Sequence, residues 1–81
     1  MNNKKVVIKW VDAKIYPGMH KFDAAVARNM DIFESLGYLV EKNDQATKIA
    51  HEITDSDEYR DILLIPSGSI ISIQELTVLT M

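Results

Sequence analysis

The chain has 81 residues, of which 47% are hydrophobic and 26% are charged, a composition typical of a folded protein rather than a disordered one. It contains no cysteine, which excludes disulfides and thiolate chemistry, so its stability must come from packing or from a partner subunit. The net charge of −3 excludes the broad basic field that gives non-specific affinity for nucleic acids. The length predicts a single small domain, residues 1–81.

Charge and hydropathy vary along the chain. Residues 1–28 hold six Lys or Arg against two Asp, whereas residues 29–81 hold three against ten acidic residues. Lys9 interrupts the apolar run Val6-Val7-Ile8, so we expect no signal peptide. No stretch approaches the roughly 18 to 20 apolar residues that cross a bilayer. These features predict a soluble, cytoplasmic protein.

The first half predicts a strand followed by a helix. β-branched and aromatic residues predict a strand from Lys4 to Tyr16, which Pro17-Gly18 ends. Residues 22–36 then change to a helical period, with an apolar stripe of Phe22, Val26, Met30 and Phe33. Gly37 stands where a left-handed helix C-cap belongs. The prediction is one helix at about residues 22–36.

The second half predicts four more strands. Residues 38–42 and 47–53 read as a hairpin around the Asn43-Asp44 turn, followed by an acidic loop at 54–58. Two further strands flank the Pro66-Ser67-Gly68 turn, and the tail 77–81 favours extending the last one. The resulting order is β-α-β-β-β-β. We therefore expect an α+β fold, a small antiparallel β-barrel with the helix covering one opening or face.

Several segments resemble known small proteins. The ending, in which a strand, a short turn and a final strand follow closely, resembles the small barrels of the SH3-like and Sm-like type. Other segments resemble short uncharacterised proteins of bacteria and their phages. This resemblance implies a phage or prophage origin, and so a place in the host cytoplasm. The segments concerned are Trp10-Val11-Asp12-Ala13, Tyr16-Pro17-Gly18, Leu36-Gly37-Tyr38-Leu39-Val40, Glu58-Tyr59-Arg60-Asp61 and residues 65–73.

Motifs that carry chemistry are incomplete in this sequence. His51-Glu52-Ile53-Thr54-Asp55 begins like a zinc motif, but Asp55 replaces the second histidine and the segment reads as a strand. Asp55 and Asp57 could open a calcium loop, but Arg60 and Pro66 replace its glycine and its final glutamate. Ser67-Gly68-Ser69 lacks the frame of a nucleophilic serine. We expect no enzyme, no metal and no cofactor.

What remains is a candidate binding surface on loops and strand ends. Aromatic and arginine side chains are enriched at binding hot spots, and lysines can pair with phosphates. The alternative for the tyrosines is that their rings are half-buried with the hydroxyls in water. The candidate residues are Tyr16, His20, Tyr59, Arg60, Lys9 and Lys14.

These observations predict a non-catalytic binding protein. It would act as a homo-oligomer that captures a host component, or a small nucleotide-like ligand such as a signal of host immunity, stoichiometrically. The alternative is an Sm-like module that binds single-stranded RNA through Lys4, Lys5 and Lys9, with affinity that falls steeply with salt. We expect three kinds of partner: a second copy of this chain, a host protein and a nucleotide-like ligand. We expect no membrane partner.

Overall fold

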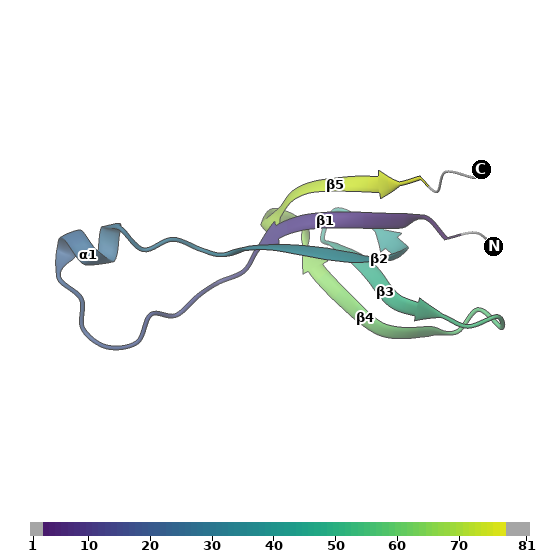
Figure 1. The fold of residues 1–81 in the computed structure, drawn as a ribbon, viewed down its shortest axis with the longest axis horizontal. Helices are drawn as coiled ribbons and strands as arrows, with labels where there is room; N and C mark the ends of the chain where they lie inside the picture. The colour runs from purple at the N-terminus through teal and green to yellow at the C-terminus, as the bar shows by residue number, and fades with distance from the viewer. Residues whose placement is uncertain (1–2, 78–81) are drawn as a thin grey trace.

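A computed structural model describes residues 3–77 and shows five strands and one short helix in the predicted β-α-β-β-β-β order. Figure 1 shows their arrangement. Two short elements interrupt the strands, an α-helix and a 3-10 turn. In chain order the elements are β1 (Lys5–Val11), α1 (Phe22–Val26), β2 (Ile32–Lys42), β3 (Ala46–Ile53), β4 (Tyr59–Pro66), η1 (Ser67–Ser69) and β5 (Ile70–Leu76).

The strands form one antiparallel sheet in the order β4-β3-β2-β1-β5. The predicted β2–β3 hairpin is confirmed: the Asn43 Oδ1 atom accepts hydrogen bonds from the N–H groups of Gln45 and Ala46 at 2.9 and 3.0 Å. The predicted closure into a barrel is wrong for residues 3–77, because β4 and β5 lie at opposite edges and the sheet is open. What the structure shows is a small, β-rich α+β fold.

The turn after β4 explains why the last two strands separate. The chain does not reverse tightly at Pro66 but makes the 3-10 turn η1, which leads to the far edge of the sheet. Ser67 ties this turn to the β2–β3 turn, its N–H donating to the Gln45 carbonyl at 2.9 Å and its hydroxyl to the Asn43 carbonyl at 3.2 Å. The chain therefore enters β5 beside β1.

The predicted helix over residues 22–36 is wrong beyond Val26. Residues 32–42 form β2, where Phe33 pairs with Trp10 and Ile32 with Val11. Lys21 makes no side-chain cap, so the helix lacks the contact that would start it firmly. A helix this short is marginal in isolation. Pairing with β1 therefore decides the conformation of Phe33 to Leu36, and Gly37 is a strand residue opposite Val6 rather than a helix cap.

The predicted ends of the first and last strands also differ from those in the structure. The first strand, expected to reach Tyr16, ends at Val11, so Tyr16 and Pro17-Gly18 belong to the following loop. β5 ends at Leu76, so Thr77 does not extend it, and the rest of the predicted extension, residues 78–81, lies outside the described residues.

The core is small and lies on one side of the sheet. Val6 and Ile8 of β1, Ile49 of β3 and Ile65 of β4 are almost completely buried. Partly buried side chains of Trp10, Leu39, Ile70 and Ile73 surround them.

A long projection leaves the sheet between β1 and β2. We call residues 12–31 the arm; it carries α1 at its far end, well away from the strands (Figure 1). The molecule is therefore elongated, 54 × 28 × 21 Å. The expectation that the helix covers a face of the sheet is wrong, because every residue of α1 is exposed. None of the helices described has the length and apolar character that a membrane span requires.

Candidate functional site

The arm gathers cationic side chains around one tyrosine. The Lys14 Nζ atom lies 4.9 Å from the centre of the Tyr16 ring, and the Arg28 guanidinium lies 5.0 Å from it. Both distances are typical of cation–π contacts. Tyr16 comes from the outgoing limb of the arm and Arg28 from the returning limb, so their contact joins the two. We call Lys14, Tyr16, His20 and Arg28 the Tyr16 cluster.

Two further contacts fix the limbs beside this cluster. The Tyr16 hydroxyl donates a hydrogen bond to the Asn29 carbonyl at 2.7 Å, and the Lys14 ammonium pairs with the Asp31 carboxylate at 2.8 Å. The hydrogen bond to Asp31, followed by the one to Tyr16, raises the pKa of Lys14 above its ordinary value. Lys14 therefore stays cationic at neutral pH.

His20 holds the turn of the arm. Its Nε2 atom lies 3.1 Å from the Pro17 carbonyl oxygen and 3.3 Å from that of Tyr16. Since carbonyl oxygens only accept, Nε2 carries the donated proton. Gly18, with φ of 88°, makes the left-handed step between these residues. His20 therefore serves first to shape the loop that presents Tyr16.

The six residues predicted from the sequence divide into separate groups. Lys14, Tyr16 and His20 come together on the arm, whereas Tyr59 and Arg60 begin β4 at the end of the sheet opposite the arm (Figure 1). There Tyr59 contacts Asn3, with a hydroxyl-to-amide nitrogen distance of 3.3 Å, and Arg60 pairs with Glu52 at 3.5 Å. Lys9 lies on β1 opposite Glu34, in neither group. One chain does not unite all six residues.

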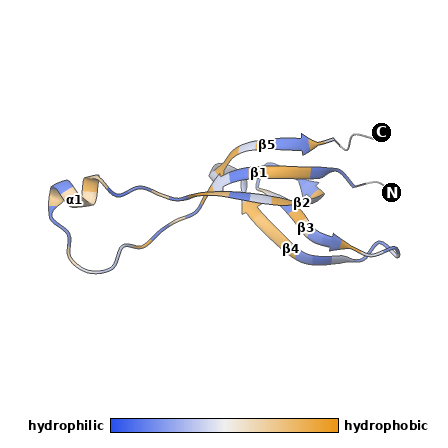
Figure 2. Cartoon of the chain, viewed as in Figure 1, coloured by the Kyte–Doolittle hydropathy of each residue, from blue (hydrophilic) through white to orange (hydrophobic). Residues whose placement is uncertain are grey.

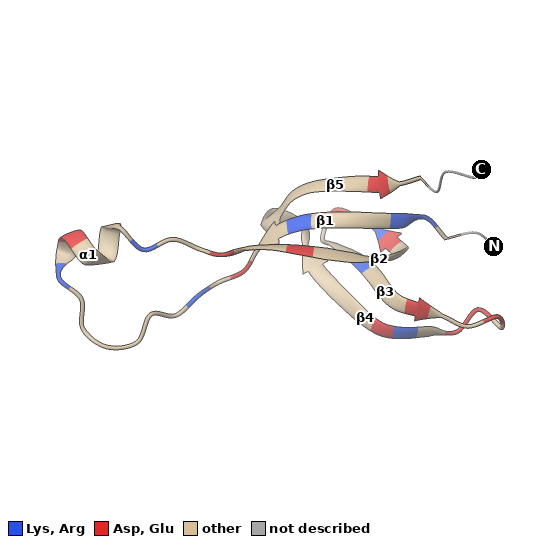
Figure 3. Cartoon of the chain, viewed as in Figure 1, with Lys and Arg blue, Asp and Glu red and all other residues tan. Residues whose placement is uncertain are grey.

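Residues of both charges occur on the arm and on the sheet (Figure 3). Acidic side chains gather in the β3–β4 loop, which carries Asp55, Asp57 and Glu58. This loop is closed by Thr54, whose N–H donates to the Glu58 carbonyl at 2.8 Å and whose hydroxyl accepts from the Glu58 N–H at 3.0 Å. Within residues 3–77, no group of three His, Asp or Glu side chains is placed to hold a metal ion.

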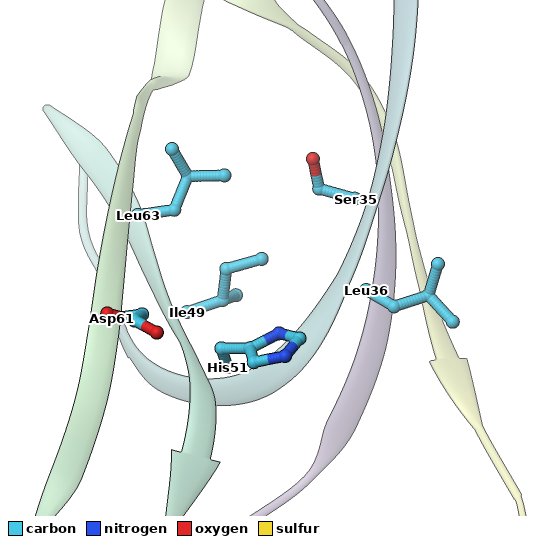
Figure 4. A pocket seen from close by; sticks show the side chains of 6 residues that line it. All are labelled: Ser35, Leu36, Ile49, His51, Asp61 and Leu63. Carbon is cyan, nitrogen blue, oxygen red and sulfur yellow. The ribbon is translucent and has the colours of Figure 1, made fainter.

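A cavity of about 500 Å³ opens on the side of the sheet that carries the core (Figure 4). It is bounded by three adjacent strands, and His51 projects from β3 toward β2. Asp61 has a φ of 57°, which is rare for a residue inside a strand. The residues that line the cavity are Ser35, Leu36, Ile49, His51, Asp61 and Leu63.

Ser35, His51 and Asp61 are the residue types of a nucleophilic triad, but they do not form its contacts. A triad requires hydrogen bonds from serine to histidine and from histidine to the carboxylate. The described part of the chain contains neither bond, and the Ser35 hydroxyl instead accepts the indole N–H of Trp10 at 3.0 Å. The cavity is a recess with a mixed polar and apolar lining.

Sequence analysis missed both the second limb of the arm and the cavity. Arg28 was assigned to the helix, so its contact with Tyr16 was not predicted. Ser35, His51 and Asp61 lie on three different strands, and only the register of β2, β3 and β4 brings them together. A basic residue about a dozen positions after an exposed tyrosine is too common to indicate such a site.

Comparison of the chain with protein-family models, curated proteins and solved structures gives no match. Its function must therefore be inferred from its own residues.

Proposed function

We propose that this chain is a non-catalytic binding protein that captures a small, anionic, nucleotide-like ligand or a host component, one for each site. The observation that carries the proposal is the Tyr16 ring with Lys14 at 4.9 Å and Arg28 at 5.0 Å. Cationic side chains pair with phosphates, and aromatic rings stack on bases. The arm holds both kinds of group on one exposed projection.

Binding would exchange contacts rather than break a covalent bond. A base that stacks on Tyr16 would displace one of the two cations from the ring, and that cation would then pair with a phosphate of the same ligand. The Tyr16–Asn29 and Lys14–Asp31 contacts hold the limbs in place before binding, which reduces the entropy lost on association.

The proposal extends to origin, fold type and assembly. We infer a phage or prophage protein of the cytoplasm, with a sheet of the SH3-like or Sm-like type that works as a homo-oligomer. The position of Tyr59 and Arg60 at the far end of the sheet supports an oligomer, because a second copy could supply them to the Tyr16 cluster of the first.

Calorimetry with mononucleotides and cyclic dinucleotides tests the ligand class. We expect saturable binding that Tyr16→Ala weakens about 5- to 150-fold, because stacking on an aromatic ring contributes about 1 to 3 kcal/mol per base. Arg28→Ala should also weaken it, whereas Lys48→Ala, which removes a cation paired with Glu41 on the sheet, should not. Absence of binding to every nucleotide, or equal loss with Lys48→Ala, would reject the nucleotide-like ligand.

Native mass spectrometry of the protein from its host lysate tests the other ligand class. A host protein retained at a fixed ratio, and lost with Tyr16→Ala, supports capture of a host component.

The RNA-binding alternative depends on Lys4, Lys5 and Lys9. The ammonium of Lys4 lies 3.8 Å from a Glu75 carboxylate oxygen, and that of Lys5 lies 5.8 Å from the centre of the Tyr38 ring. The Glu75 carboxylate offsets the charge of Lys4, and the Tyr38 ring contacts one cation where the Tyr16 ring contacts two, so the aromatic contacts favour the Tyr16 cluster. Single-strand binding that disappears with salt and with neutral substitutions of these lysines would instead favour RNA.

A further inference from the structure

The molecule exposes more surface than a compact protein of its mass. Its accessible surface is 6775 Å², whereas a compact monomer of 9.2 kDa would expose about 4,900 Å². Its radius of gyration is 16.7 Å, against about 12 Å expected for this length. The excess, about 1,800 Å² per chain, lies in the range that each partner buries in an obligate homodimer.

The arm is apolar and electrically neutral. It contains three Lys or Arg and three Asp residues, so it carries no net charge. In α1 the Phe22 side chain is 81% exposed and that of Val26 is 67% exposed. Hydrophobic residues alternate with polar ones along the arm (Figure 2). The large apolar side chains exposed on it are Ile15, Met19, Phe22, Val26 and Met30.

Among residues 3–77, no helix covers the cavity on the sheet. A sheet becomes stable when its apolar face packs against another layer, commonly a helix. In the part of the chain that the structure describes, no helix lies over Leu63, which contributes to the cavity wall. The Leu63 side chain of β4 is 36% exposed. The Phe33 side chain of β2, on the same face of the sheet, is 44% exposed. Within residues 3–77, α1 thus exposes apolar side chains that pack against nothing, and the cavity, with its mixed polar and apolar lining, is not covered by a helix.

Within one chain, α1 lies at the far end of the arm, away from the sheet that carries the cavity (Figure 1). The Lys14–Asp31 pair and the Tyr16–Asn29 hydrogen bond join the limbs just beyond the sheet. With the limbs joined, the arm projects away from the sheet (Figure 1). For α1 to reach the cavity of its own chain, both limbs would have to bend back sharply where they leave β1 and β2.

We propose that the arm of one chain places α1 over the cavity of a second copy, and that the second arm does the same in return. Such a reciprocal exchange buries both apolar parts and is closed by two-fold symmetry. The second copy is the occupant because this chain itself carries both halves of the contact, and because the excess surface matches what an obligate dimer buries. The inference rests on the self-association within the proposed function and does not depend on ligand capture.

The absence of native cysteine gives a direct test by disulfide trapping. Phe22→Cys in one batch and His51→Cys in a second, ¹⁵N-labelled batch are mixed under mild oxidation. We expect the disulfide between the two batches to form at least about tenfold faster than when Asp44→Cys replaces His51→Cys. The reason is that docking raises the effective concentration of one thiol at the other into the millimolar range. Asp44 is exposed in the β2–β3 turn, so it serves as the matched control.

Light scattering provides the second measurement. The wild-type chain should have at least twice the monomer mass at micromolar concentration, and Phe22→Asp should reduce it to the monomer mass. Phe22 is not packed in its own chain, so Trp10 fluorescence should report an unchanged fold. A monomeric wild type, a Phe22→Asp variant that still dimerises, or trapping no faster than the control would overturn the proposal. Nucleotide binding by such a monomer would show that self-association failed while ligand capture held.

Discussion

A methyl group placed on Gly37 would lie 2.9 Å from the carbonyl oxygen of Ala50, so β2 and β3 approach where only a hydrogen atom fits. The obstructing atom belongs to the backbone and cannot rotate away. We expect Gly37→Ala to lower the free energy of unfolding by about 1 to 3 kcal/mol, the usual effect of overpacking. Urea denaturation followed by fluorescence of the single tryptophan, Trp10, would measure it.

Gly68→Ala is the matched control. A methyl group there would meet nothing within 4 Å, and Gly68 does not have a positive φ. We expect no loss of stability, or a gain of up to about 1 kcal/mol through a less flexible unfolded chain. If Gly37→Ala proved as stable as the wild type, β2 and β3 would have room for a methyl group; an equal loss with Gly68→Ala would mean that the loss does not come from the approach of these strands.

Thr47 is the one buried polar side chain of the described residues, and its hydroxyl oxygen has no hydrogen-bond partner among them. It lies on β3 opposite Ile65, which is fully buried. Valine has the same branched shape without the hydroxyl. We expect Thr47→Val to raise the free energy of unfolding by about 1 to 2 kcal/mol, because the buried hydroxyl no longer has to be desolvated.

Thr47→Ser separates the two parts of this side chain. It keeps the hydroxyl and removes the methyl group, so we expect it to lower stability by about 0.5 to 1.5 kcal/mol, as loss of one buried methyl does. Thermal or urea unfolding of the three proteins would rank them. A Thr47→Val variant less stable than the wild type would mean that the hydroxyl is hydrogen-bonded in solution.

Trp10 is fixed on β1 by two neighbours on β2. Its indole N–H donates to the Ser35 hydroxyl at 3.0 Å, and its ring stacks on Phe33 with centroids 5.0 Å apart. Ser35→Ala should lower the free energy of unfolding by about 0.5 to 1.5 kcal/mol, and Phe33→Leu by a similar amount through the lost aromatic contact. A double-mutant cycle should give a coupling above about 0.5 kcal/mol, because both contacts position one ring. Simple additivity would contradict this.

Local sequence signals predicted the parts of the fold that depend on neighbouring residues. The Asn43 turn and the strands beside it follow from side chains within a few positions, whereas the turn at Pro66-Ser67-Gly68, predicted to join two neighbouring strands, is the 3-10 turn η1. The helix was overextended because Met30 and Phe33 continue the stripe of Phe22 and Val26. In the folded chain Phe33 gains a strand partner, Trp10, and tertiary pairing outweighs helix propensity.

The candidate site was predicted only in part for a similar reason. Tyr16 and His20 were predicted to lie on one loop, whereas Lys14 was placed in the first strand, which ends at Val11. Arg28 reaches Tyr16 only because the arm returns. β5 pairs with β1 and not with β4. No local residue pattern determines which edge of the sheet the last strand joins.

Glu41 and Lys48 form an exposed pair across the β2–β3 hairpin, with 3.0 Å between the Glu41 Oε1 and Lys48 Nζ atoms. The hydrogen bond from Lys48, and then its charge, hold the pKa of Glu41 below its ordinary value. Stabilisation by this pair is therefore complete above the pKa of Glu41 in the unfolded chain, about 4.3, and is lost as the pH falls through the lower folded value. We expect the stability difference between the wild type and Glu41→Gln to shrink below about pH 4, and Lys48→Met to remove the same pH dependence. An NMR titration of the Glu41 carboxyl carbon checks the cause: a midpoint at or above that of an ordinary glutamate would contradict it, whereas a lower midpoint that returns to the ordinary value in Lys48→Met would establish the pair as its source.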